Sequence, residues 1–167
     1  QEKGIFVKTS VNLSAQELTD DATIEVVRVA LAENGVRAEN LEVEITETGL
    51  MENVDRASQI LQTLSSWEVR VALDDFGKGY SSLSYLQKLP INIIKIDKGF
   101  VDGLPEDKDS VTLVQTIIAM AHNLGKEVLA EGVEHEEQSQ TLLELGCDYG
   151  QGFLWSRPQP VDNLSLR

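Results

Sequence analysis

Apolar runs and amphipathic segments alternate along the chain in a regular rhythm. Short apolar runs predict six strands, at residues 5–13, 41–45, 69–73, 93–96, 127–130 and around 147–150. The segments between them repeat apolar residues three and four positions apart. They predict helices at 20–33, 54–67, 110–124 and 136–145, and a short helix that ends near Pro90. Three of the longer helices are followed by a glycine, Gly35, Gly125 or Gly146, as is common where a helix stops.

The order strand, helix, strand, helix predicts a parallel sheet. Its strands are rich in β-branched residues and read as apolar without alternation, which predicts burial on both faces. Two architectures remain, an open doubly wound sheet and a closed barrel. Polar residues at the carboxyl ends of the strands favour the barrel, because in a barrel those ends converge on one mouth. We therefore expect an α/β fold, a TIM-like (β/α) barrel.

A complete barrel of this kind has eight strands and roughly 250 residues. Six strands in 167 residues predict an incomplete barrel, a single domain over 1–167 that lacks the first two strands. An open arc would leave two unpaired edges, which favour aggregation. Because Gln1 is not an initiator residue, we also expect the chain to come from a longer parent protein that supplies the missing strands.

Nearly every predicted strand ends in a side chain that can bind a metal ion or take part in catalysis. These residues are Asn12, Glu44, Asp74 with Asp75, Lys95, Glu131 and Gln151. Oxygen ligands such as Asn12, Glu44, Asp74 and Asp75 suit Mg²⁺ or Mn²⁺, and the lack of nearby His and Cys argues against zinc. Two such ions, about 3.5–4 Å apart, would hold a phosphodiester and activate the attacking water.

Other polar residues are expected to support this site. Lys95 would stand beside the water or the phosphate, and Glu131 would act as the base or hold a second ion. Glu134 would contact these residues without touching the reacting groups. Glu47 would hold a glycine-rich loop by accepting backbone hydrogen bonds. That loop, with Lys78 between Gly77 and Gly79 and with Tyr80 and Ser81 behind it, would close over the site.

Each residue also has a purely structural explanation. A single acid at a strand end is more often a helix cap or a surface residue, but six of six strands ending this way makes chance improbable. His122 and His135 are expected to be exposed or to cap helices, and Cys147 and Met120 to lie in the core. Phe153 and Trp155, near Pro158, are equally consistent with stacking on a base and with packing.

The composition narrows the class of partner. The formal net charge of −14 argues against a DNA or RNA polymer, whose binding proteins normally present basic patches. A small anionic substrate would need a cation, and a metal ion would supply one. A lone cysteine, no apolar run of about 20 residues and no signal peptide predict a cytoplasmic location, with the parent protein possibly anchored to a membrane.

Six stretches of the sequence resemble the EAL-domain family, the bacterial phosphodiesterases that open cyclic di-GMP to a linear dinucleotide. They are Val-Asn-Leu-Ser-Ala-Gln at 11–16, Glu-Ile-Thr-Glu at 44–47, Asp-Asp-Phe-Gly-Lys-Gly-Tyr-Ser-Ser-Leu at 74–83, Lys-Ile-Asp at 95–97, Ala-Glu-Gly-Val-Glu at 130–134 and Gln-Gly-Phe at 151–153. They cover the chain almost from end to end, in order.

The resemblance implies a role for each residue. Asn12, Glu44 and Asp74 would bind one Mg²⁺ or Mn²⁺ ion, and Asp74 and Asp75 a second. Lys95 and Glu131 would hold or deprotonate the water, with Asp75 counted among the catalytic residues, and Glu47 would anchor the loop. The substrate would be surrounded by Glu134, Gln151, Asp97, Phe153 and Pro158. It also implies cyclic di-GMP as ligand, the linear dinucleotide pGpG as product, a possible homodimer, and upstream sensory or GGDEF-type domains.

Two departures from the family pattern stand out. Lys78 replaces the small residue usual in the loop, and the Glu-Ala-Leu segment that names the family, with its metal-binding Glu, is absent from residues 1–167. The isolated chain is therefore expected to be inactive and poorly folded. Two alternatives remain open: a non-catalytic EAL-like receptor for cyclic di-GMP, and a barrel enzyme of another class, such as an enolase-type Mg²⁺ lyase.

Overall fold

Six parallel strands form one sheet in the computed structural model, which describes residues 7–77 and 83–160. The strands lie in chain order: β1 (Thr9–Leu13), β2 (Leu41–Thr46), β3 (Arg70–Phe76), β4 (Ile93–Ile96), β5 (Glu127–Ala130) and β6 (Tyr149–Gly150). Within the described residues β1 and β6 each pair with one strand, so the sheet is an arc of a TIM-like (β/α) barrel, as predicted.

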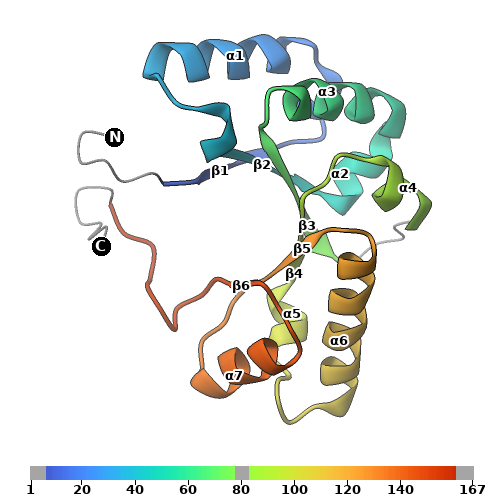
Figure 1. The fold of residues 1–167 in the computed structure, drawn as a ribbon, viewed down its shortest axis with the longest axis vertical. Coiled ribbons are helices and arrows are strands. Elements are labelled where there is room, and N and C mark those ends of the chain that lie inside the picture. The colour runs from blue at the N-terminus through green and yellow to red at the C-terminus, as the bar shows by residue number, and fades with distance from the viewer. Residues whose placement is uncertain (1–6, 78–82, 161–167) are drawn as a thin grey trace.

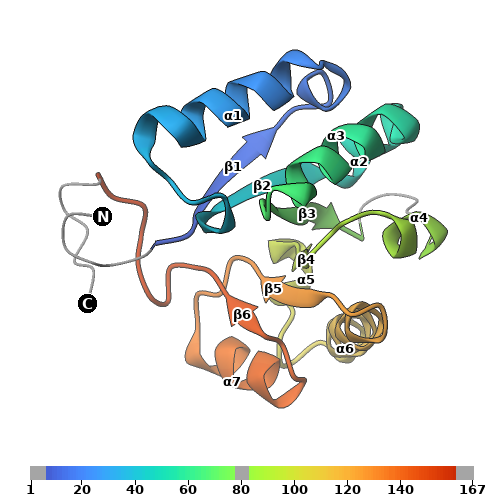
Figure 2. The same ribbon diagram turned by 45° about the horizontal axis from the view of Figure 1, so that its top comes forward.

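Helices cover the outer side of the arc (Figure 1). The longer ones are α1 (Ala22–Asn34), α3 (Val54–Ser66), α6 (Lys108–Asn123) and α7 (Glu136–Glu144). Shorter ones are α2 (Glu47–Glu52), α4 (Leu83–Lys88), α5 (Lys98–Val101) and the 3₁₀ turns Glu17–Thr19 and Ala38–Asn40. In Figure 2, α1 and α3 lie outside β1 to β3, and α6 and α7 lie outside β5 and β6.

The helix ends agree with the local sequence signals. Helix α1 stops at Gly35, whose φ of 59° is left-handed and suits glycine. The side chain of Asn53 accepts a hydrogen bond from Arg56 N at the start of α3. The side chain of Asp107 accepts hydrogen bonds from the backbone N of Asp109 and Ser110 at the start of α6. Helices α2 and α5 were not predicted, because one or two turns carry too few residues for a periodic pattern. Each begins directly at a strand end, capped by Thr46 or Asp97.

The outer face of the sheet is apolar. Buried residues such as Ile45, Leu73, Ile94 and Val128 meet buried residues of the helices in one continuous core. The helix residues include Ile60, Leu61, Leu64, Val114, Ile118 and Leu142. Met120 and Cys147 pack against this core, as expected.

The inner face of the sheet is polar, which differs from the expectation of two apolar faces. Side chains on neighbouring strands that pair in register share a face, and the pairs Ser10–Glu42, Glu42–Arg70 and Thr46–Asp74 all lie on this one. Apolar and polar residues therefore alternate along β2, and burial alternates along β5. The inner face carries charge because its charged groups pair with one another.

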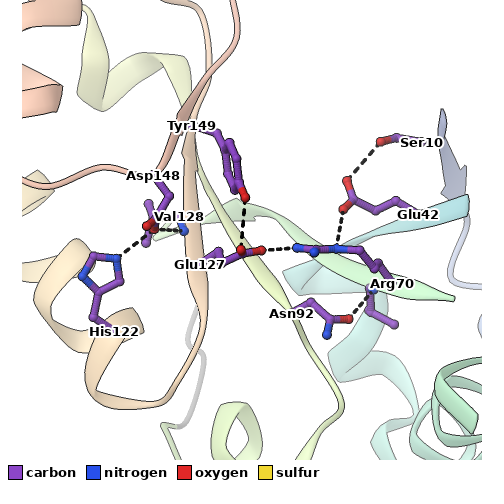
Figure 3. Close-up of polar contacts among 10 residues, drawn as sticks. Ser10, Glu42, Arg70, Asn92, His122, Glu127, Val128, Asp148 and Tyr149 are labelled. Atoms are coloured by element: carbon purple, nitrogen blue, oxygen red, sulfur yellow. Dashed lines mark hydrogen bonds and ion pairs between the residues drawn. The ribbon is translucent and has the colours of Figure 1, made fainter. Parts of the chain in front are cut away.

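One charged network lies near the amino ends of the strands (Figure 3). Arg70 on β3 forms ion pairs with Glu42 on β2 and with Glu127 on β5. Ser10 donates to Glu42 at 3.0 Å, and the Tyr149 hydroxyl donates to Glu127 at 3.0 Å. The network thus joins β1, β2, β3, β5 and β6 across the inner face.

Asp148 makes a second contact at this end. Its Oδ2 lies 2.8 Å from His122 Nε2 and accepts a hydrogen bond of 2.8 Å from Val128 N (Figure 3). Burial alone would raise the pKa of Asp148, but these hydrogen bonds outweigh it and the pKa is lowered. His122 is exposed, as predicted, and His135 is exposed and precedes α7.

Across the residues described, no helix is both long and apolar enough to span a bilayer.

Candidate functional site

Lys95 lies at the centre of three carboxylates near the carboxyl ends of the strands. Its Nζ is 2.7 Å from Oε2 of Glu44, 2.7 Å from Oε1 of Glu131 and 3.5 Å from Oδ2 of Asp74. Glu44 lies on β2, Asp74 on β3 and Lys95 on β4, and Glu131 directly follows β5. The structure therefore brings four of the predicted site residues together, and we refer to Lys95, Glu44, Asp74 and Glu131 as the Lys95 cluster.

The backbone explains why Lys95 is buried here. Strand β4 is buried along its whole length, and Ile94 and Ile96 face the outer core. Alternation then points Lys95 to the inner face, where it is 3% exposed. An ammonium group that is this buried needs charged partners to remain ionised, and the three carboxylates supply them.

The charges of the cluster contribute to shifts in the pKa values of Lys95 and Glu131. Burial alone would lower the pKa of Lys95, but hydrogen bonds to Glu131 and Glu44 and the charge of Asp74 outweigh it, so the pKa is raised. The pKa of Glu131 is also raised, mainly by burial and further by the charges of Asp74 and Glu44. Its hydrogen bond to Lys95 offsets only part of this. The raised pKa of Glu131 is closer to that of a proton acceptor at neutral pH.

The chain bends sharply where Asp74 meets Asp75. Oδ1 of Asp74 accepts a 2.8 Å hydrogen bond from the backbone N of Asp75. Asp75 has a φ of 56°, unusual for a residue other than glycine, and the register between β3 and β4 shifts between Leu73 and Phe76. Strained backbone of this kind is concentrated at functional sites.

Glu47 contacts the start of the glycine-rich loop. It is 2% exposed, and its Oε2 accepts a hydrogen bond of 3.3 Å from Gly77 N. Oε1 of Glu47 has no hydrogen-bond partner among the described residues. Gly77 has a φ of 101°, and a Cβ there would lie 2.9 Å from Cε2 of Phe100, so only glycine fits. The loop residues Lys78, Gly79, Tyr80 and Ser81 lie outside the described part of the chain.

Asn12, another predicted ligand, lies on β1 beside the Lys95 cluster. It pairs in register with Glu44 and shares the inner face with it, but its side chain is exposed. In residues 7–77 and 83–160, no group of three or more His, Cys, Asp or Glu side chains is arranged to hold a metal ion.

The remaining predicted residues make other contacts. Asp97 caps α5 by accepting a 2.8 Å hydrogen bond from Gly99 N, and Glu134 forms an ion pair with Lys98. Gln151 N donates to Ala130 O at 2.8 Å, which extends β6 alongside β5. Gln151, Phe153 and Pro158 line a hollow of about 760 Å³. Its described lining includes Glu42, Arg70 and Tyr149 of the amino-end network and no residue of the Lys95 cluster. The guanidinium of Arg157 lies 4.4 Å from the centre of the Phe153 ring.

Sequence reasoning missed the network around Arg70. The alternation Leu41, Glu42, Val43, Glu44, Ile45 was a signal that β2 has a polar face, and Arg70 and Glu127 open two further strands. It also missed Lys98, whose position at a helix start gave no signal.

The family model described as EAL domain matches residues 1–158. The chain belongs to the EAL domain family. Among curated relatives it is 41% identical to the cyclic di-GMP phosphodiesterase NbdA of Pseudomonas aeruginosa, over 95% of this chain and 20% of that protein. The chain thus spans about a fifth of the length of this relative.

Two solved structures have the same fold. The PaMucR phosphodiesterase, in a complex with c-di-GMP, superposes with a TM-score of 0.88 at 41% identity, over 93% of this chain and 63% of that one. The Klebsiella pneumoniae protein BlrP1, in a calcium and cyclic di-GMP complex, gives 0.83 at 31% identity, over 90% of this chain and 39% of that one.

Proposed function

We propose that the protein carrying this EAL domain is a metal-dependent phosphodiesterase that hydrolyses cyclic di-GMP to the linear dinucleotide pGpG. One observation carries the proposal: Lys95, Glu44, Asp74 and Glu131 converge at the carboxyl ends of the strands. The comparisons support the substrate, since NbdA is a cyclic di-GMP phosphodiesterase and PaMucR binds c-di-GMP.

In this proposal, Glu44, Asp74, Asp75 and Asn12 would hold two Mg²⁺ or Mn²⁺ ions. Their donor chemistry fits, because all four offer oxygen ligands and the carboxylates of Glu44 and Asp74 already approach one cationic nitrogen, at 2.7 and 3.5 Å. Such ions supply positive charge to the phosphate and acidify bound water. They also let a chain with a net charge of −14 bind an anion. The family resemblance adds one further carboxylate ligand from the Glu-Ala-Leu segment.

Glu131 acts as the base, and Lys95 orients it. Water attacks the phosphorus of one phosphodiester and gives its proton to Glu131, while the bond from phosphorus to the ribose 3′ oxygen breaks. That oxygen takes up a proton from solvent, and Glu131 later returns its proton to solvent. The product carries one 5′-phosphate and one 3′-hydroxyl. Lys95 lies 2.7 Å from Glu131, where its charge keeps the carboxylate in place and offsets charge that develops on the phosphate.

The surrounding residues position the substrate. Glu47 anchors the glycine-rich loop through Gly77 N. In this proposal Glu134, Gln151, Asp97, Phe153 and Pro158 would surround the bound substrate, and the exposed ring of Phe153 would offer a face for a base. We place the domain within a longer cytoplasmic protein that forms a homodimer and carries sensory or GGDEF-type domains upstream.

The test is product analysis with the full-length protein, cyclic di-GMP and Mg²⁺ or Mn²⁺. We expect pGpG, none of it after chelation by EDTA, and none from Glu131→Gln, which should still bind the substrate. Binding without product in the wild-type protein would instead identify a receptor. If the wild-type protein shows no binding and forms no product, the proposal is overturned. Unchanged turnover by Glu131→Gln would refute the role of Glu131.

A further inference from the structure

Glu131 begins a four-residue segment, 131–134, whose backbone is held from two sides. Glu131 N donates a 3.0 Å hydrogen bond to Ile96 O at the end of β4. Val133 is fully buried, and its N donates to Gln151 O at 3.0 Å. These bonds fix the backbone at Glu131 and at Val133, and Gly132 lies between the two residues.

The side chain of Lys98 packs against Gly132. A Cβ added to Gly132 would lie 2.6 Å from Cβ and 2.7 Å from Cδ of Lys98, so the aliphatic part of the lysine lies flat on the glycine backbone. Gly132 also has a φ of 69°, a conformation that favours glycine. This close approach leaves the Glu131 backbone little room to shift toward α5.

The ammonium group of Lys98 then holds the far end of the same segment. Its Nζ forms an ion pair with Oε1 of Glu134, and Asp102 Oδ1 lies 3.7 Å away. The hydrogen bond from Lys98 lowers the pKa of Glu134. One side chain thus contacts both the middle and the end of the segment that carries Glu131.

A buried glutamine ties the segment to the other end of α5. Oε1 of Gln138 accepts hydrogen bonds from the backbone N of Glu134 at 2.9 Å and of His135 at 3.0 Å. Its Nε2 donates to Val101 O at 3.2 Å. Helix α5, which directly follows the strand that carries Lys95, is therefore joined to the Glu131 segment at both of its ends.

We propose that Lys98 is a positioning residue, which fixes the backbone next to Glu131 and so sets how Glu131 meets Lys95. The inference rests on the proposed function, in which Glu131 is the base. Lys98 acts only through Gly132 and Glu134, and it is not a catalytic residue. Small displacements of a catalytic group lower the rate strongly, while binding of the substrate is less affected.

Three substitutions in the full-length protein separate the two contacts. Lys98→Arg keeps the aliphatic part and the charge, Lys98→Met keeps only the aliphatic part, and Lys98→Ala removes both. We expect kcat to stay within about twofold for Arg, to fall roughly threefold for Met and to fall roughly tenfold for Ala, with KM within about twofold throughout. Lys108→Met, an exposed lysine at the start of α6, is the control and should match the wild type.

A second readout does not depend on activity. Hydrogen exchange, followed by mass spectrometry on a peptide that contains Val133, should speed up in Lys98→Ala and stay unchanged in Lys98→Arg and Lys108→Met. The melting temperature should stay within a few degrees for all variants, because the ion pair is half exposed.

Two results would overturn the inference. One is wild-type kcat together with wild-type exchange in Lys98→Ala, and the other is a loss of kcat that only follows a fall in melting temperature. If the wild-type protein makes no pGpG, the proposed function fails, while the exchange of the Val133 amide still reports whether Lys98 holds the segment.

Discussion

Lys95 on β4 and Glu44 on β2 form a 2.7 Å ion pair across the strand that lies between them. Two strands separated by a third lie about 10 Å apart in a flat sheet. The inward curvature of the sheet brings their side chains together on the inner face. The arc therefore builds the Lys95 cluster, and a flat sheet with the same residues would separate its charges.

Replacing Lys95 by methionine should destabilise the protein strongly. Glu44, Asp74 and Glu131 would be left partly buried without their cation, and we expect the free energy of unfolding at pH 7 to fall by roughly 3 kcal/mol. Because the pKa of Lys95 is raised on folding, its stabilisation is complete below the usual lysine pKa and is lost only as pH rises through the raised value.

Urea denaturation at pH 7 and pH 9 measures this deficit. The loss in free energy of unfolding caused by Lys95→Met should be the same at both pH values. The control Lys88→Met, on the exposed end of α4, should show no loss. A deficit that shrinks between pH 7 and pH 9 would mean that Lys95 has a lowered pKa, contrary to the contacts described here.

Arg70→Met should lower stability without changing the site. Glu42, which is 7% exposed, would lose its cation, and we expect a loss of roughly 2–4 kcal/mol in the free energy of unfolding. Adding Glu42→Gln should recover part of the loss, because the buried charge is then removed. Arg56→Met is the matched control. Arg56 pairs with Asp21, which is mostly exposed, so the free energy of unfolding should fall by less than about 1 kcal/mol. Equal losses for Arg70→Met and Arg56→Met would argue against a buried network.

Asp148→Asn should weaken the contact with His122 and Val128 in a pH-dependent way. The lowered pKa of Asp148 means that its stabilisation is present above the usual pKa of about 3.9 and is lost as pH falls through the lowered value. We expect a deficit of about 1 kcal/mol at pH 7 that shrinks toward pH 3. Denaturation curves at pH 7, 5 and 3 test this, and a deficit independent of pH would show that the charge is not involved.

Gly152→Ala should cost far more than an ordinary change of glycine to alanine. A Cβ at Gly152 would lie 2.6 Å from the carbonyl carbon of Val133, which is backbone and cannot move aside. We expect a loss of at least about 3 kcal/mol. Gly125→Ala is the comparison, because Gly125 has a φ of 68° and open space around it, so only backbone strain of about 1 kcal/mol applies. Thermal melts of both variants check the difference, and equal costs would contradict the close contact.

Local signals were enough to predict much of the fold. The six strands and the longer helices follow from apolar patterns, and Gly35 marks the end of α1 as expected. The predicted boundaries differ by a few residues, and β6 is only Tyr149–Gly150. The one-turn helix α5 was missed because its sequence contains no complete period.

Long-range pairing was beyond the reach of sequence reasoning. The sequence predicted that acids and Lys95 meet at the strand ends, but not that Lys95 would contact Glu44, Asp74 and Glu131 together. Arg70 and Glu127 are 57 positions apart, and only the curvature of the sheet makes them partners. Lys98 and Glu134 are 36 positions apart and were missed for the same reason.

Apolar residues separate the two charged groups on the inner face. Ala72 lies between Arg70 and Asp74 on β3, Ile93 precedes Lys95 on β4, and Leu129 lies between Glu127 and Glu131. Substitutions at the Arg70 end can accumulate without disturbing the charges around Lys95. The sheet therefore separates the groups that govern its heat tolerance at one end from the groups that carry the proposed chemistry at the other.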